Sequence, residues 1–173
     1  CGDLHWFLSP RILHPYSEFL QQFCVPSPLL CLITRLGGNG LTESCAEDLA
    51  TALNASIFLT ELYVGTNKLG DSGVKAMCPA LSNPGCKIQK LWLWGNGLPD
   101  SCTEDLVAAL SAKCSVTDVE LGSNSFSERS VPALCRLTLA LPSLQWIGFW
   151  GNQFSSNGAK QLQGCRPKLT VAI

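Results

Sequence analysis

The sequence predicts an α/β solenoid, in which the parallel strands of successive units form a sheet on the inside of an arc and their helices lie outside. Two observations predict this fold: a frame of apolar residues recurs along the chain, and a helix-like spacing of leucines follows it. Asparagines mark the period, at intervals of 28, 29, 28 and 28 residues. Self-similarity at a period of about 20 to 50 residues is typical of solenoids, whose units bury a shared core only when stacked. The repeat asparagines are Asn39, Asn67, Asn96, Asn124 and Asn152.

The strand half of each unit is the frame L-x-x-L-x-L-x-x-N-x-L, with conservative apolar exchanges. Four copies are clear: LTELYVGTNKL (59–69), IQKLWLWGNGL (88–98), VTDVELGSNSF (116–126) and LQWIGFWGNQF (144–154). A degenerate copy, CLITRLGGNGL (31–41), keeps the register. Side chains alternate between the two faces of a strand, so the leucines of the frame are expected to face the core. We expect each asparagine to be buried, with its amide bonded to the backbone of its own turn and of the next unit.

The helical half of the unit follows the asparagine. Two leucines lie four residues apart in TESCAEDLATAL, which follows Asn39, Gly40 and Leu41, and again in DSCTEDLVAAL, which follows the frame of Asn96. One face of a helix requires this spacing. Ser44 with Glu47, and Ser101 with Glu104, form the S-x-x-E pattern of a capping box, in which hydroxyl and carboxylate satisfy orphan backbone donors at a helix start. We therefore expect helices to begin at these serines.

Pro79 lies inside another predicted helix, which starts near Asp71. Proline lacks the backbone N–H and costs about 3 kcal/mol in a regular helix interior. That helix is therefore expected to end early or to kink near Met77.

Composition and charge exclude several kinds of partner. The 173 residues, 46% of them hydrophobic, suffice for one domain with a substantial core. Twelve basic and 13 acidic residues give a net charge of −1 without a basic cluster, so nucleic acid is not expected as a partner. No run of 18 apolar residues occurs, and CGDLHWFLSP is not a signal peptide, so membrane insertion is not expected. The start at Cys1 suggests a piece of a longer chain.

The ten cysteines allow two interpretations, a disulfide framework or reduced thiols. Cys45 and Cys102 are 57 residues apart, as are Cys78 and Cys135, so these four follow the repeat rather than a pairing pattern. No C-x-x-C pair occurs, and both histidines lie near the start of the chain, which disfavours a structural zinc site. We expect buried, reduced thiols that act as small hydrophobes, with no metal and no cofactor.

The residues that alternate with the leucines are expected on the exposed, concave side of the sheet. Four of the five tryptophans are among them. Exposed aromatic side chains often anchor protein contacts, so the sequence favours a contact surface for another protein or another domain. The alternative is that neighbouring side chains cover one another, Trp92 beside Tyr63 for example, and need no partner. The candidate protein-binding residues are Glu61, Tyr63, Lys90, Trp92, Trp94, Asp118, Glu120, Trp146 and Trp150.

Several of these segments resemble leucine-rich repeats of the ribonuclease-inhibitor type. The resemblance is carried by SCAEDLATAL, SCTEDLVAAL, NKLGDSGVKAMCPALSNPGCKIQKLWLWGNGL and the terminal RPKLTVAI. The chain looks most like the C-terminal repeats of the NLRP proteins, NOD-like receptors that join a pyrin domain and a NACHT nucleotide-binding module to such an array. The resemblance covers residues 31–173 and implies a ribonuclease-inhibitor-like horseshoe arc of about five repeats, at the C-terminal end of the array. Residues 1–30 fit the frame poorly and are interpreted as a degenerate repeat or an unassigned segment.

The resemblance also implies a function. The array would be a non-catalytic, cytoplasmic protein-interaction module that contributes to ligand sensing, autoinhibition and inflammasome-type innate immune signalling. Its partner would be the receptor's own NACHT module or a foreign protein, with oligomer contacts made through the parent receptor. No G-x-x-x-x-G-K-[ST] motif occurs, so no nucleotide-binding residue is carried over.

A ribonuclease inhibitor is the rival binding hypothesis. Such an inhibitor grips a basic enzyme with a strongly acidic concave face, whereas this chain offers Glu61, Asp118 and Glu120 against Lys90. It also has Trp150, followed by a glycine, where the inhibitor carries a Tyr-Asp pair. Both departures favour the receptor.

Two further classes are less favoured. An enzyme usually needs a histidine or paired carboxylates in a cleft. His5 and His14 lie in the segment that fits the repeats least, and Glu104 and Asp105 are typical of a helix start, where negative charge is favourable. A pure structural scaffold differs from a binding module in one observable, since its tryptophan fluorescence would not change when a partner is added.

Overall fold

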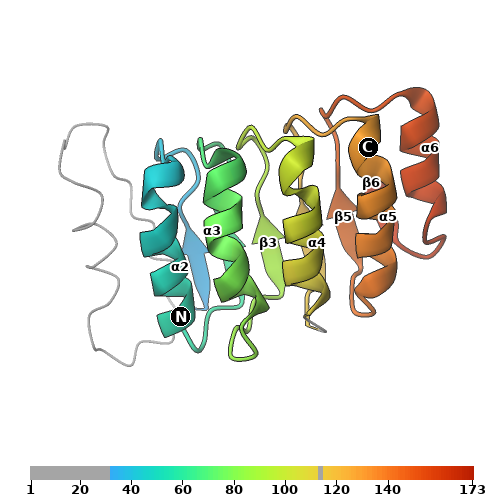
Figure 1. Ribbon diagram of the computed structural model, residues 1–173. Helices are drawn as coiled ribbons and strands as arrows, with labels where there is room; N and C mark the ends of the chain where they lie inside the picture. The colour runs from blue at the N-terminus through green and yellow to red at the C-terminus, as the bar shows by residue number, and fades with distance from the viewer. Residues whose placement is uncertain (1–31, 113–114) are drawn as a thin grey trace.

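The computed structural model describes residues 32–112 and 115–173. The segment 1–30, interpreted above as a degenerate repeat, lies outside the described residues. Within them, strands and helices alternate along the chain (Figure 1). The strands are β1 (Ile33–Arg35), β2 (Glu61–Tyr63), β3 (Lys90–Trp92), β4 (Asp118–Glu120), β5 (Trp146–Gly148) and β6 (Thr170–Ala172). The helices are α2 (Ala46–Ala55), α3 (Gly70–Ser82), α4 (Thr103–Ser111), α5 (Val131–Ala140) and α6 (Ser156–Gly164).

The strands form one parallel sheet in the order β1-β2-β3-β4-β5-β6. Each strand pairs with the next in the same register, so that Leu62 lies beside Leu91 and Val119 beside Ile147. The helices lie side by side along one face of this sheet (Figure 1), and each packs on the next. The expected α/β leucine-rich repeat solenoid is therefore confirmed. Strand β6 extends the sheet beyond the last copy of the frame. The frame does not predict this strand.

The hydrophobic core lies between the sheet and the helices. The central residues of the strands, such as Leu62, Leu91 and Val119, have no exposed surface, while the residues on either side of Leu62 and Leu91 are half-exposed. Leu106 and Leu110, four residues apart in α4, are buried against them. Full burial of such a side chain contributes about 1.5–3 kcal/mol. The alternation of the frame and the helical spacing therefore meet in one shared core.

The repeat asparagines bind the backbone of two turns. The Nδ2 group of Asn96 donates to the carbonyl of Leu93 in its own turn (3.1 Å) and to that of Val64 in the preceding turn (3.1 Å). The Oδ1 atom of Asn124 accepts the backbone N–H groups of Asn96 (3.0 Å) and Leu98 (3.1 Å), again in the preceding turn. The second contact was expected with the next unit. It is made with the preceding one, because the amide lies between its own turn and the turn before it.

The burial of these asparagines varies along the stack. It depends on the turns on both sides, and no turn precedes Asn39 within the described residues. Asn39 is exposed where burial was predicted, and its Nδ2 group lies 3.4 Å from the carbonyl of Gly37. The others are more enclosed: Asn67, Asn96 and Asn124 are buried and Asn152 is half-buried.

The predicted capping boxes do not form. Ser44 and Ser101 lie inside short 3₁₀ turns, Glu43–Cys45 and Asp100–Cys102, which precede α2 and α4. The turns place each serine one residue before the N-cap, so its hydroxyl does not cap the α-helix. Ser101 donates instead to the carboxylate of Asp71 in α3 (2.8 Å) and so links two units.

Helix α3 continues through Pro79 to Ser82, so the predicted early end near Met77 is wrong. Pro79 itself is exposed, and the two residues after it, Ala80 and Leu81, are buried in the core. Their burial offsets the cost of the missing backbone N–H. Packing here outweighs the local preference of the sequence.

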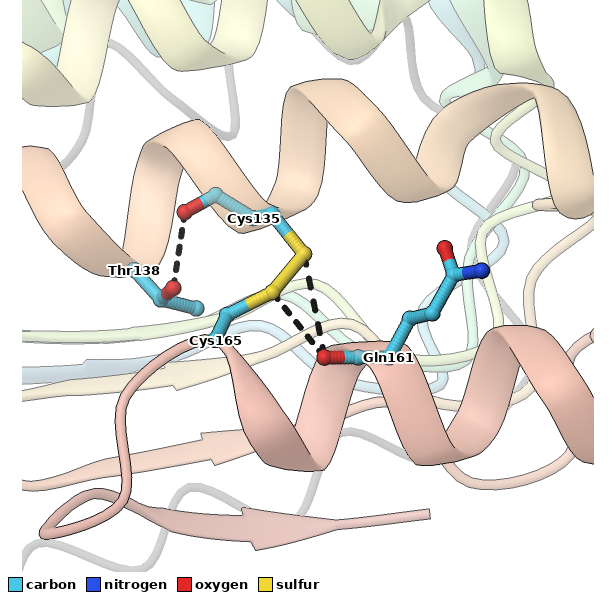
Figure 2. The surroundings of a disulfide bond; sticks show 4 residues. All are labelled: Cys135, Thr138, Gln161 and Cys165. Carbon is cyan, nitrogen blue, oxygen red and sulfur yellow. Dashed lines mark hydrogen bonds between the residues drawn. A yellow bond between two sulfur atoms is a disulfide. The ribbon is translucent and has the colours of Figure 1, made fainter.

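A disulfide joins Cys135 of α5 to Cys165, which follows α6 (Figure 2). Reduced thiols were expected, and this pair corrects that expectation. The stacking of neighbouring helices brings the two Cα atoms to 5.6 Å, a separation that a disulfide can span. The repeat spacing could not reveal the pair, because it aligns Cys135 with Cys78 and gives Cys165 no counterpart.

Other cysteines behave as the sequence predicted. Cys45 and Cys102 are buried and carry no disulfide. Burial raises the pKa of Cys102 to about 12 and that of Cys78 to about 11. Both thiols are therefore protonated and unreactive near neutral pH.

Two absences hold for residues 32–112 and 115–173. No helix there combines the length and the apolar character that crossing a bilayer requires. No three His, Cys, Asp or Glu side chains gather in positions that could hold a metal ion.

Candidate protein-binding surface

The candidate residues share the side of the sheet opposite the helices, which we call the open face. In β2 and β3 the residues on either side of buried Leu62 and Leu91 are half-exposed. Because successive side chains of a strand point to opposite faces, these residues point away from the core. The open face comprises Arg35, Glu61, Tyr63, Gly65, Lys90, Trp92, Trp94, Asp118, Glu120, Gly122, Trp146, Gly148 and Trp150.

Charged residues line the start of the strands. Lys90 Nζ lies 3.0 Å from Glu61 Oε1, and the hydroxyl of Tyr63 donates to Glu61 Oε2 (2.7 Å). Burial alone would raise the pKa of Glu61, but the hydrogen bonds from Tyr63 and Lys90 outweigh it and lower the pKa below its ordinary value. Asp118 is the register neighbour of Lys90 and accepts a hydrogen bond from Thr117 (2.6 Å).

Aromatic rings follow one another across the middle of the open face. The guanidinium of Arg35 lies over the ring of Tyr63, 5.3 Å from its centroid. The ring centroids of Tyr63 and Trp92 are 4.9 Å apart, and those of Trp92 and Trp146 are 6.2 Å apart at 22°. Neighbouring side chains thus cover one another in part, as the alternative interpretation proposed. The Nε1 atom of Trp92 is nevertheless buried without a hydrogen-bond partner among the described residues.

A second aromatic pair lies beyond the strand ends, where Trp94 and Trp150 have centroids 6.1 Å apart. Each ring lies over a glycine of the preceding unit. A β-carbon at Gly65 would overlap the ring of Trp94, and one at Gly122 would lie 2.6 Å from the ring of Trp150. The two glycines therefore let the indoles lie close to the sheet. Trp150 still keeps 41% of its surface exposed.

Glu120 is buried, with only 5% of its surface exposed, although the alternation predicts an exposed residue. Its Oε1 accepts the backbone N–H of Gly122 (2.6 Å), and its Oε2 accepts the indole N–H of Trp150 (3.0 Å). A β-carbon at Gly148 would lie 2.5 Å from both carboxylate oxygens. The carboxylate therefore leans across β5 over a position without a side chain, and the tryptophans beside it exclude water.

Sequence reasoning missed two features of this surface. The alternation of the frame puts Gly65 and Gly122 on the same face as the indoles, but it does not reveal that they lie beneath the rings. The sequence does contain a signal for this contact. Gly65 occupies the same position of the frame as Trp94 in the next unit. Arg35 was missed because it belongs to the degenerate copy, although it is the register neighbour of Tyr63.

Comparisons with known proteins agree with this geometry. No protein family model matches the chain. It is 42% identical over 95 residues to "NACHT, LRR and PYD domains-containing protein 3" of Homo sapiens, covering 55% of this chain and 9% of that protein. It is 35% identical over 124 residues to "NACHT, LRR and PYD domains-containing protein 2" of Homo sapiens, covering 70% of this chain and 12% of that protein. The ribonuclease inhibitor of Mus musculus is 34% identical over 144 residues, covering 83% of this chain and 31% of the inhibitor.

A solved structure of the leiomodin-1 actin-binding site 2 matches with a TM-score of 0.51 at 11% identity, over 91% of this chain and 78% of that one. This likeness concerns the fold alone. The chain spans about a tenth of the length of its NLRP relatives and less than a third of the inhibitor. Repeat period, sheet, helices and relatives agree, and the chain is therefore a leucine-rich repeat array of the NLRP type.

Proposed function

We propose that the chain is a non-catalytic protein-interaction module of a cytoplasmic NOD-like receptor. In this role it contributes to ligand sensing, autoinhibition and inflammasome-type innate immune signalling. It requires no cofactor, and its partner is the receptor's own NACHT module or a foreign protein. The likeness to relatives named for NACHT, LRR and PYD domains supports the receptor context.

One observation supports the open face as the contact surface. Aromatic side chains gather there, opposite the helices, and Trp150 at the end of this group remains 41% exposed. Tryptophan is enriched among residues that dominate binding energy, because it brings a large apolar area and a hydrogen-bond donor.

The test replaces Trp94 and Trp150 by alanine, singly and together, in the chain within its full-length protein. Binding of a separately purified NACHT module should weaken at least tenfold in the double variant, and basal signalling should rise. The matched control is Leu139→Ala, which removes an apolar side chain that is 64% exposed on α5, away from the open face. Unchanged binding and unchanged basal signalling in the tryptophan variants, with an unchanged melting temperature, would contradict the proposal.

A ribonuclease inhibitor is the second candidate. The match to the mouse inhibitor covers 83% of this chain, a larger share than the 55% matched by the NLRP3 relative. Titration against a pancreatic-type ribonuclease at physiological salt separates the two functions, since tight inhibition would favour the inhibitor. A pure structural scaffold is the remaining alternative, and it predicts no change in tryptophan fluorescence when the NACHT module is added.

A further inference from the structure

We propose that the partner of the open face presents an arginine side chain, which stacks on Trp150 and binds the carboxylate of Glu120. This inference rests on the proposed protein-binding function and names the chemistry of the partner. Glu120 lies on β4, with Trp92 of β3 and Gly148 of β5 as its register neighbours.

The first argument is the incomplete compensation of a buried carboxylate. Glu120 is 5% exposed, and its two hydrogen bonds come from neutral donors, the N–H groups of Gly122 and Trp150. A carboxylate offers about four acceptor positions, and burial of a charge is costly unless an opposite charge pairs with it. In the described part of the chain no lysine or arginine forms an ion pair with Glu120.

The cations of the open face are already engaged elsewhere. Lys90 pairs with Glu61 at 3.0 Å, and Arg35 lies over the ring of Tyr63. Both are on β3 or earlier, whereas the acidic residues of β4, Asp118 and Glu120, face the tryptophans of the next unit. This part of the face therefore combines negative charge with exposed aromatic surface, and a cation from outside complements both.

The geometry around the carboxylate favours a flat cation. Glu120, Trp146 and Trp150 converge over two positions without side chains. A β-carbon at Gly148 would lie 2.5 Å from the carboxylate and 2.6 Å from Trp146, and one at Gly122 would lie 2.6 Å from Trp150 and 2.8 Å from the carboxylate. The indole N–H of Trp150 thus points at Glu120 while 41% of the surface of Trp150 remains exposed.

Arginine fits this arrangement better than lysine. A guanidinium can lie flat on an indole and donate in its own plane to a carboxylate, so that cation–π attraction and a charge-assisted hydrogen bond act together. The ammonium group of lysine is compact and strongly hydrated, and it gives up more hydration on entering such a site.

A second observation points to the same partner. Among the residues that the structure describes, the indole N–H of Trp92 is buried without a partner. Trp92 is the register neighbour of Glu120, about 4.8 Å away along the sheet. A buried donor without an acceptor costs about 1–3 kcal/mol. A backbone carbonyl from the segment that carries the arginine satisfies it once the indole turns outward, because the N–H has no exposed surface in this structure. The open face therefore offers an acceptor for a cation beside a donor for a peptide carbonyl.

The test uses two peptides of nearly the same shape, acetyl-Gly-Gly-Arg-Gly-Gly-amide and the same peptide with citrulline, whose uncharged urea group has a carbonyl oxygen where arginine has a nitrogen donor. Each is titrated into the 173-residue chain while the indole N–H resonances are followed by NMR. The arginine peptide should shift the Trp150 resonance saturably and bind at least tenfold more tightly than the citrulline peptide. The variant Glu120→Gln keeps a hydrogen-bond acceptor for Trp150 and removes the charge, and it should lower the affinity for the arginine peptide at least tenfold.

The matched control is Glu104→Gln, which removes a carboxylate on α4, away from the open face, that Arg136 already neutralises. It should leave the affinity for the arginine peptide unchanged within twofold. Equal affinity for both peptides would overturn the inference, as would a Glu120→Gln variant that binds arginine like the parent. If that variant does not fold, the comparison of the two peptides on the parent chain still decides. If the NACHT module binds the open face without any preference for arginine, this inference fails while the proposed function stands.

Discussion

At the scale of single residues, glycines determine the shape of the open face as much as the tryptophans do. Trp94 approaches the sheet because Gly65 of the preceding unit has no β-carbon, and Trp150 uses Gly122 in the same way. Both glycines are buried under the indoles. The positions of the aromatic residues therefore depend on small residues one unit away.

Replacement of Gly65 by alanine tests this dependence. The new methyl group would overlap the indole of Trp94, so the ring must swing outward or the strand must shift, at a cost of about 1–3 kcal/mol in free energy of unfolding. Urea unfolding measures the loss, and a red shift of the tryptophan emission reports the displaced ring. Gly164→Ala at the end of α6 is the control, since no heavy atom lies within 4 Å of its added β-carbon. Equal stability of the two variants would contradict the close contact.

At the scale of elements, the turns are joined through the repeat asparagines. Asn124 accepts two backbone N–H groups and donates to the carbonyls of Leu121 (3.0 Å) and Leu93 (3.2 Å). Removal of this amide would leave buried backbone donors and acceptors without partners. The turn is therefore a joint between units rather than a simple reversal of the chain.

Asn124→Ala should lower the free energy of unfolding by about 2–4 kcal/mol, because each buried polar group left unsatisfied costs about 1–3 kcal/mol. Asn39→Ala is the matched control, since Asn39 is exposed and, within the described part of the chain, its side-chain amide bonds only to the carbonyl of Gly37. It should change stability by less than about 0.5 kcal/mol. Equal losses in the two variants, measured by urea unfolding, would show that the buried amide is not what stabilises the joint.

The disulfide between Cys135 and Cys165 joins α5 to the residue that follows α6 (Figure 2). Helix α6 buries few residues, Gly158 and Leu162, so a covalent link matters more there than in the middle of the stack. Reduction should lower the free energy of unfolding by about 3 kcal/mol, in the range typical of a loop of this length. Thermal unfolding with and without dithiothreitol measures the effect. Cys165→Ser should abolish the response to the reductant, and an equal response in the variant would assign it to other thiols.

At the scale of the whole molecule, stability depends on pH, and within residues 32–112 and 115–173 three carboxylates have a lowered pKa. Hydrogen bonds from Lys75 and Ser101 lower the pKa of Asp71. Burial would raise the pKa of Glu61 and of Asp100, but their hydrogen-bond partners outweigh it and lower both values. Each group holds its proton less tightly in the folded chain than in the unfolded one. Its stabilising contribution is therefore present above the unfolded pKa, near 4, and is lost as the pH falls through the folded value.

These groups should accordingly leave the melting temperature unchanged between about pH 7 and pH 5. At pH values below about 4 the melting temperature should decrease. Asp100→Asn should flatten this acid limb, because the bonds from Ser127 and Ser130 would no longer depend on a titrating group. Calorimetry from pH 7 to 3 on both proteins provides the measurement. A variant whose acid limb is as steep as that of the parent would remove Asp100 from the explanation.

The sequence predicted the array and the direction of its side chains because both follow from short-range spacing. Leucine alternation placed Trp92 and Trp94 on the open face without any knowledge of their neighbours. It could not predict that Glu120 is buried, because burial depends on Trp150, which comes a full unit later and reaches back across the sheet. The disulfide at Cys165 and the uninterrupted α3 likewise depend on which helices stack, and local patterns do not contain that information.

The contact between an indole and the glycine before it has a consequence for how such an array can change over generations. At the position of Trp94 a tryptophan lies close to the sheet without a clash only where the preceding unit carries a glycine, so the favourable order is glycine first and tryptophan second. The reverse order passes through a poorly packed intermediate. For the same reason the units of this array cannot be freely exchanged. If the unit that carries Trp94 followed a unit without a glycine at the position of Gly65, the indole would clash with the side chain there.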